Sequence, residues 1–276
     1  MAVNTLISVK EAVEMTEALF IDCRFNLADP SAGRNAYEAE HIPQAVYADL
    51  EQDLSGKIVT GKTGRHPLPD VAELTKTFSE LGISNQKPVI AYDADNGAFA
   101  SRLWWLLRHL GHGSVWVLNG GLKAWRNDGQ PTSSQATSIE TSAFTAATSL
   151  CQVVDATQIP GLSNSLIDAR EEARFRGEQE PIDPVAGHIP NATCMPFSQN
   201  LDEVGLFKTP EVLRQQFVGH GISGQSPAIC YCGSGVTACH NILAIRHAGL
   251  PEPFLYPGSW SEWVTDPTRP IATKLD

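Results

Sequence analysis

The chain carries the same set of short motifs twice, and this duplication constrains its architecture more than any other feature. An apolar run ending in Asp-x-Arg, a His-Ile-Pro turn, a second apolar run and a segment ending in Trp occur in the same order in both halves. Chance would not preserve the order of four motifs, so the sequence predicts two copies of one domain. The matching positions are Asp22 and Asp168, His41 and His188, Asp93 and Cys232, and Trp125 and Trp263.

A stretch rich in serine and threonine separates the two copies. Residues 131–150 show no sustained helical or strand periodicity, which is typical of an interdomain linker. We therefore predict a first domain over residues 1–130, a linker over 131–150 and a second domain over 151–276. Both predicted domains fall within the usual size range of a folding unit.

Strand-like and helix-like segments alternate within each copy. The apolar runs at residues 19–22, 88–92 and 227–231 resemble strands that are buried in a parallel sheet. Helical patterns at 100–111 and 237–249 follow two of these runs, and each ends on glycine after a basic residue. The alternation predicts an α/β fold in which each domain has a mainly parallel central sheet flanked by helices.

Composition excludes several classes of partner. The 276 residues carry a net charge of −11, which repels phosphate backbones and anionic lipids, so we expect no nucleic-acid and no membrane partner. No apolar run approaches the ~20 residues that span a bilayer, and the N-terminus does not resemble a secretory signal. Six cysteines are too few for a disulfide scaffold, so we expect a reducing compartment, most simply the cytoplasm.

The candidate nucleophile is Cys232, which lies between a predicted strand and a helix that we expect to begin near Thr237. Ligands bind α/β proteins at this position. Gly233 and Gly235 allow successive backbone N–H groups to turn toward one point, and the helix N-terminus adds partial positive charge. Both effects stabilise a thiolate, so we expect a lowered pKa for Cys232.

Three kinds of chemistry use a cysteine loop of this sort. A cysteine phosphatase needs an arginine six positions after the nucleophile, and Ala238 stands there. A zinc site is not predicted because no Cys-x-x-Cys pair is present, and Cys230 and Cys239 fit inert core thiols. Sulfur transfer through a cysteine persulfide remains, because the loop N–H groups can hold the bound sulfur and its negative charge.

The CGSGVTACHN loop, the paired DAR and DCR strands, RFRGE, the HIP turns and GSWSEW together resemble the tandem-domain rhodanese and 3-mercaptopyruvate sulfurtransferase family. The resemblance covers essentially the whole chain. It implies two tandem rhodanese-like domains, of which only the second is catalytic, with the substrate in the cleft between them. Asp93 stands in the first domain where the second has Cys232, so the first domain is expected to be non-catalytic.

The resemblance also implies roles for the loop around Cys232. Gly233 and Ser234 match the mercaptopyruvate type, whereas thiosulfate-type members resemble CRKGVTA. Ser234 would hydrogen-bond the substrate or relay a proton, assisted by a histidine and a carboxylate at the positions of His66 and Glu51. An ordinary loop histidine is the alternative for His66. The loop residues expected to bind substrate are Gly233, Gly235, Val236 and Thr237.

Arg174, in RFRGE, matches the family arginine that binds the substrate carboxylate; a surface arginine paired with Glu171 or Glu178 is the alternative. Similar mercaptopyruvate enzymes often carry a second arginine shortly afterwards, but this chain has Ile182 near that place. Arg176 is the residue that we consider as its replacement.

The predicted function is transfer of a sulfane sulfur from 3-mercaptopyruvate, through a Cys232 persulfide, to cyanide, a small thiol or a thioredoxin-like protein. No metal or organic cofactor is implied. Two alternatives stay open. One is a thiosulfate:cyanide sulfurtransferase with the same nucleophile, and the other is a catalytically silent rhodanese-like binding module.

Overall fold

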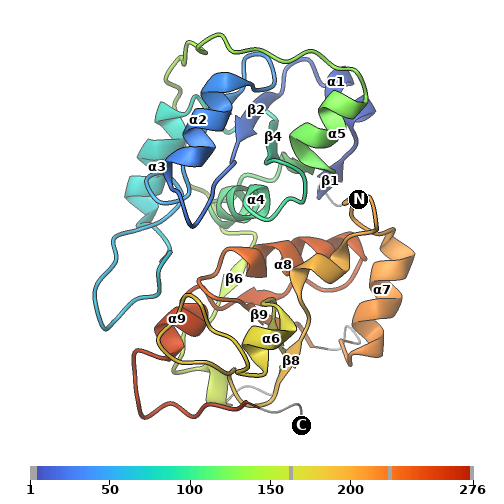
Figure 1. Cartoon of the computed structure of the whole chain (residues 1–276). Helices are drawn as coiled ribbons and strands as arrows, with labels where there is room; N and C mark the ends of the chain where they lie inside the picture. The colour runs from blue at the N-terminus through green and yellow to red at the C-terminus, as the bar shows by residue number, and fades with distance from the viewer. Residues whose placement is uncertain (1–4, 162–163, 223–225, 274–276) are drawn as a thin grey trace. The chain divides into compact units, whose positions relative to one another are not determined.

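The computed structural model describes residues 5–161, 164–222 and 226–273. The chain divides into two compact units, and most of their helices and strands are labelled in Figure 1. Unit 1 comprises Met1–Gly56, Pro69–Leu150 and Glu203–Phe207; unit 2 comprises Lys57–Leu68, Cys151–Asp202 and Lys208–Asp276. Each unit therefore includes one short segment that lies, in sequence, within the other half of the chain.

Unit 1 is built on a five-stranded sheet in the order β1-β5-β4-β2-β3, and its strands pair in parallel. The strands are β1 (Leu6–Ile7), β2 (Leu19–Asp22), β3 (Val46–Tyr47), β4 (Val89–Tyr92) and β5 (Val115–Leu118). The helices between them are α1 (Val9–Glu14), α2 (Ser31–Ala39), α3 (Val71–Glu80), α4 (Ala100–His109) and α5 (Gly121–Asn127).

Unit 2 repeats this topology, with a parallel sheet in the order β6-β10-β9-β7-β8. The strands are β6 (Gln152–Val153), β7 (Leu166–Asp168), β8 (Ala192–Cys194), β9 (Ile229–Tyr231) and β10 (Phe254–Leu255). The α-helices are α6 (Glu172–Phe175), α7 (Pro210–Gly219), α8 (Thr237–His247) and α9 (Ser259–Trp263); the 3-10 helices are η1 (Ile159–Gly161) and η2 (Phe197–Asn200). The predicted α/β fold with two parallel sheets is confirmed.

The central strands explain the apolar runs in the sequence. All residues of β4 and β9 are buried, because each strand has a neighbour on both sides and is covered on both faces. The helices that follow them, α4 and α8, are also buried along almost their whole length. A helix that is apolar on most of its surface is expected in such a position. The loop between β9 and α8 is therefore anchored at both ends in the core.

The repeated Asp-x-Arg motif closes a buried ion pair at the end of the strand beside each central strand. Asp22 pairs with Arg24 at 2.6 Å, and Asp168 pairs with Arg170 at 2.7 Å. Both carboxylates are fully buried, and an unpaired charge there would be strongly destabilising. The repeated motif therefore serves local charge pairing in both units.

Residues 131–150 pack along unit 1 with no helix or strand of their own. Ser133 forms an isolated bridge with His41. Further along, the buried Phe144 packs edge-to-face against Phe78 of α3, with 5.4 Å between ring centroids. These contacts belong to unit 1, so the segment predicted as a linker is grouped with the first unit.

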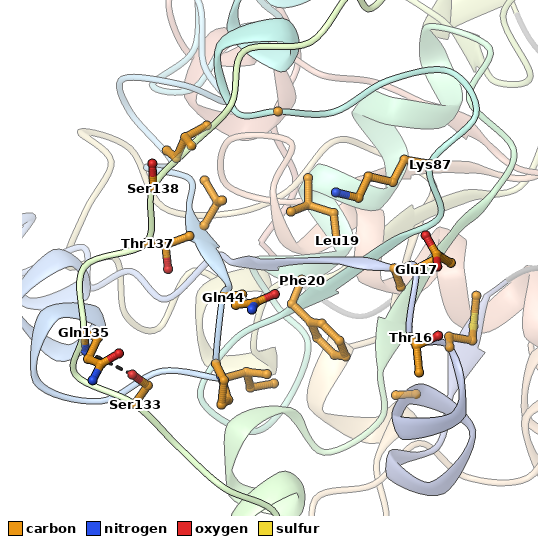
Figure 2. Close-up of a pocket in the computed structure, with 18 of the residues that line it drawn as sticks. Thr16, Glu17, Leu19, Phe20, Gln44, Lys87, Ser133, Gln135, Thr137 and Ser138 are labelled. Carbon is orange, nitrogen blue, oxygen red and sulfur yellow. Dashed lines mark hydrogen bonds between the residues drawn. The ribbon is translucent and has the colours of Figure 1, made fainter.

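A groove of about 860 Å³ runs between this segment and the core of unit 1 (Figure 2). Its lining is mixed, with apolar side chains such as Leu19 and polar ones such as Gln44, Lys87 and Thr137. All of its lining residues belong to unit 1, whereas Cys232 belongs to unit 2. Among the described residues, no helix has the length and apolar character needed to cross a membrane.

Candidate active site

Cys232 follows the last residue of β9 and opens the loop that leads into α8. The residue is 2 % exposed, and its Sγ accepts a hydrogen bond of 3.1 Å from the backbone N–H of Gly235. Helix α8 begins five residues after Cys232, at Thr237, so the partial positive charge of its N-terminus is close to the sulfur. Both features suit a sulfur that carries negative charge during a reaction.

Gly235 is required by the shape of this loop. Its φ is +76°, in the left-handed region that favours glycine, and an added Cβ would lie 2.5 Å from the carbonyl oxygen of Pro257. Any other residue would push the loop away from Pro257 and move the N–H group that reaches Cys232. Val236 is buried and Thr237 begins α8, so the predicted substrate-binding loop ends where the helix starts.

The residues that begin α9 hold the loop from the opposite side. Ser259 Oγ accepts a hydrogen bond from the N–H of Cys232 at 3.1 Å, and the N–H of Trp260 donates to the carbonyl of Cys232 at 2.9 Å. The N–H of Ser261 donates to the carbonyl of Gly233, also at 2.9 Å. The sequence analysis assigned no role to these serines, although the GSWSEW motif that contains them was a usable signal.

His66 lies beside the loop because residues 57–68 belong to unit 2. Its Nδ1 is 2.8 Å from Ser234 Oγ, and both side chains are buried, at 3 % and 6 % exposure. The structure therefore brings together three of the predicted catalytic residues, Cys232, Ser234 and His66. A histidine hydrogen-bonded to a hydroxyl can move a proton through it.

Glu51, the fourth predicted catalytic residue, belongs to unit 1. It is exposed, and its backbone N–H donates to Oδ1 of Asp49 at 2.9 Å. Its catalytic role stays a prediction.

Arg174, on α6, is tied into a buried acidic cluster. Its Nη2 pairs with Glu180 at 2.7 Å and with Asp183 at 3.0 Å, rather than with Glu171 or Glu178. Burial raises the pKa of Asp183, and neighbouring arginines, led by Arg65, oppose that rise. The guanidinium of Arg174 is fixed by two carboxylates, so it is not an ordinary surface arginine.

Arg65 is a site residue that sequence reasoning missed. It precedes His66, its Nη1 pairs with Asp183, and its backbone N–H donates to Oγ of Ser261 at 3.1 Å. No motif marked it, although a cation directly before the candidate histidine was a usable signal.

Cys230 and Cys239 are buried, as predicted for core thiols, whereas Cys194 is only partly buried. Burial raises the pKa of Cys230 and of Cys23 well above the usual range, and burial together with Asp168 raises the pKa of Cys194 to about 12. Among the described residues, no group of three or more His, Cys, Asp or Glu side chains could hold a metal ion.

In unit 1 a carboxylate fills the loop that matches the Cys232 loop. Asp93 follows β4 and accepts hydrogen bonds from the N–H groups of Gly97, Phe99 and Ala100, at 2.9, 3.0 and 3.2 Å. Burial raises the pKa of Asp93, while these three donors oppose the rise. The backbone donors that could face a bound anion are occupied by the protein's own side chain.

The fold and the site define a class: a duplicated parallel α/β protein with a cysteine loop at the carboxyl end of one central strand. The rhodanese-like domain model matches residues 5–128 and 152–266. The chain belongs to the rhodanese-like family.

Individual relatives agree with the predicted sulfurtransferase class. A protein described as a probable 3-mercaptopyruvate sulfurtransferase of Pseudomonas aeruginosa is 48 % identical over 266 residues, covering 93 % of each chain. The thiosulfate sulfurtransferase of Cricetulus griseus is 36 % identical over 241 residues, covering 83 % of this chain and 79 % of that protein. The structure of 3-mercaptopyruvate sulfurtransferase from Leishmania major matches with a TM-score of 0.85 and 32 % identity, covering 95 % of this chain and 75 % of that one.

Proposed function

We propose that the protein is a sulfurtransferase that takes sulfur from 3-mercaptopyruvate and passes it to a thiophilic acceptor through a persulfide on Cys232. The observation that carries the proposal is the contact between His66 and Ser234, 2.8 Å, two residues after the cysteine. A buried hydroxyl–imidazole pair can deliver a proton to the enolate that 3-mercaptopyruvate leaves behind when it loses its sulfur. Thiosulfate leaves sulfite, which needs no such proton.

In the first half-reaction the Cys232 thiolate attacks the sulfur of 3-mercaptopyruvate. A sulfur–sulfur bond forms and the carbon–sulfur bond of the donor breaks, leaving its electron pair on carbon as the enolate of pyruvate. Ser234, hydrogen-bonded to His66, supplies the proton that converts the enolate to pyruvate. The N–H of Gly235 faces the sulfur and stabilises its negative charge.

In the second half-reaction an acceptor nucleophile attacks the outer sulfur of the persulfide. With cyanide, a carbon–sulfur bond forms, the sulfur–sulfur bond breaks, and thiocyanate leaves while Cys232 returns to the thiolate. A small thiol or a reduced thioredoxin-like protein would accept the sulfur in the same way. The six free thiols fit a reducing compartment, for which the cytoplasm is our proposal.

Initial rates with 3-mercaptopyruvate and with thiosulfate, using cyanide as acceptor, test the proposal in the wild type and in Cys232→Ser. We expect a clear preference for 3-mercaptopyruvate and no thiocyanate formation above background in the variant. A preference for thiosulfate would keep the nucleophile but contradict the proposed donor. No turnover of either donor would favour a binding module.

A further inference from the structure

We propose that Arg65 supplies the second guanidinium for the carboxylate of the sulfur donor, and that Asp183 positions it beside Arg174. This inference rests on the proposed function, because it names the groups that recognise the donor at the same site. It concerns the place that the sequence left open, where Ile182 stands instead of a second arginine. Ile182 itself is 44 % exposed.

Asp183 joins the two arginines through different oxygens. Its Oδ1 accepts from Nη1 of Arg65, and its Oδ2 accepts from Nη2 of Arg174 at 3.0 Å. Asp183 is 8 % exposed, so the carboxylate is a buried anchor rather than a mobile surface group. One carboxylate with two guanidinium partners fixes the distance and the relative orientation of both cations.

Each arginine keeps another nitrogen directed toward the cysteine loop. A Cβ built on Gly233 would lie 2.8 Å from Nη2 of Arg65 and 3.5 Å from Nη1 of Arg174. Within residues 5–161, 164–222 and 226–273, neither of these nitrogens donates a hydrogen bond, and Nε of Arg65 is buried without a partner. Two donors on separate, rigidly held guanidinium groups thus face the residue next to Cys232.

Charge balance indicates what these donors would bind. The three arginines of the cluster, at 65, 170 and 174, face three carboxylates, at 168, 180 and 183, so the cluster is formally neutral. A dianion would add two negative charges to a neutral, largely buried cluster, whereas a monocarboxylate adds one. The arrangement therefore favours a short monocarboxylate such as a 2-oxo acid over thiosulfate.

Gly233 leaves room for this arrangement. Any side chain at this position would enter the space now used by Nη2 of Arg65, and Arg65 would have to move. We therefore expect Gly233 to influence donor specificity indirectly, because the absence of a side chain lets Arg65 lie beside the cysteine loop.

The test compares Arg65→Gln and Arg65→Lys with Arg176→Gln as a matched control. Arg176, which the sequence offered as the second arginine, instead pairs with the exposed Glu172, and its own side chain is 38 % exposed. The arginine nitrogens found beside Gly233 are those of Arg65 and Arg174. Steady-state rates give kcat and KM for 3-mercaptopyruvate, and calorimetry gives the dissociation constant of pyruvate, which needs no turnover. We expect Arg65→Gln to raise both KM and the pyruvate dissociation constant about 10- to 100-fold, with little change in kcat.

Arg65→Lys should recover part of this loss, because the charge returns without the second directed donor. Arg176→Gln should leave both constants unchanged. Asp183→Asn removes the anchor's charge; as a positioning residue it should raise KM and the pyruvate dissociation constant while kcat stays near wild type. The melting temperature should fall as well, because Arg65 and Arg174 each lose a buried anionic partner.

The outcomes separate this inference from the proposed function. If wild type turns over 3-mercaptopyruvate but Arg65→Gln matches Arg176→Gln in KM and pyruvate binding, the assignment of Arg65 is wrong and the function stands. If wild type does not turn over 3-mercaptopyruvate but loses pyruvate affinity on Arg65→Gln, the carboxylate site stands and the proposed function is wrong. If wild type does not bind pyruvate at all, the assignment of Arg65 is overturned.

Discussion

Cys232 differs from the other thiols in what surrounds its sulfur. An N–H donor lies 3.1 Å from Sγ and the α8 N-terminus follows, whereas burial is the main influence on the thiols of Cys23 and Cys230, and nearby carboxylates add to it at Cys23. Burial raises the pKa of both core thiols, which keeps them protonated at neutral pH. The thiolate is the reactive form of cysteine, so the groups around each sulfur distinguish the reactivity of these cysteines better than their exposed fractions do.

We predict that iodoacetamide near pH 6 modifies Cys232 before any other cysteine. Cys194 is the strictest comparison, because it is more exposed than Cys232, but its pKa is raised to about 12. Peptide mapping by mass spectrometry after short exposure measures the order, and Cys232→Ser is the control that should remain unlabelled. Labelling of Cys194 ahead of Cys232 would contradict the nucleophile assignment and strengthen the reading as a silent binding module.

Helix α6 is very short, and ion pairs to Glu180 stabilise the region around it. It spans only Glu172–Phe175, and the strand-to-helix region around it is held by Arg170 and Arg174 against Glu180. Glu180 is 4 % exposed at its side chain and also accepts the backbone N–H groups of Ile182 and Asp183. A four-residue helix has little stability of its own, so these ion pairs fix the orientation of Arg174.

Replacing Glu180 by Gln should cost about 3 kcal/mol of unfolding free energy at pH 7, because the buried Arg170 and the partly buried Arg174 each lose one of their two carboxylate partners. Burial alone would raise the pKa of Glu180, but its hydrogen bonds from Arg174 and the Asp183 N–H lower it overall. A carboxyl with a lowered pKa stabilises the fold above its usual value of 4.5 and loses that contribution as the pH falls through the lowered pKa. The deficit of Glu180→Gln should therefore shrink in strong acid.

Urea unfolding at pH 7 and at pH 3 measures this difference. The matched control is Glu172→Gln on the same helix, since Glu172 is 53 % exposed at its side chain and pairs with Arg176, which is 38 % exposed. We expect the control to change stability by less than about 0.5 kcal/mol. Equal stabilities for the two variants would show that the cluster does not hold α6.

At the scale of the whole molecule, repeated motifs and hydrophobic periodicity were enough to predict the two domains and their central strands and helices. The duplicated motifs indicated two α/β copies, and the apolar runs located strands β2, β4, β7 and β9 and helices α4 and α8. The loop glycines pointed to Cys232, and a family resemblance pointed to Ser234, His66 and Arg174. Each of these features is carried by a short stretch of neighbouring residues, so it can be recognised in a single sequence.

The remaining features depend on contacts between residues far apart in the chain. His66 and Ser234 are separated by 168 positions, and Arg65 and Asp183 by 118. Residues 57–68 belong to unit 2 because the segment can approach α9 closely. The pattern of apolar and polar residues in the sequence contains no information about such an approach. The assignment of Arg65 therefore needed the structure.

Gly64 is the residue that permits this approach. An added Cβ would lie 2.5 Å from the carbonyl oxygen of Gly258 and 2.6 Å from Oγ of Ser261, the atom that accepts the N–H of Arg65. The backbone of Gly258 cannot move without a large energetic cost, so a larger residue at position 64 would displace the segment away from the cysteine loop. The loop itself is held by separate bonds from Ser259 and Trp260 and should keep its shape.

We predict that Gly64→Ala lowers kcat/KM for 3-mercaptopyruvate at least about 10-fold, as expected for an overpacked contact, while Cys232 is still alkylated at the wild-type rate. Gly61→Asn is the matched control in the same segment, because its glycine has a left-handed φ that asparagine tolerates and no heavy atom within 4 Å of an added Cβ. Loss of both activity and alkylation in Gly64→Ala would mean that the segment also shapes the cysteine loop. Unchanged activity would mean that His66 and Arg65 are not needed at their present distances, because the segment that carries them would have moved without consequence.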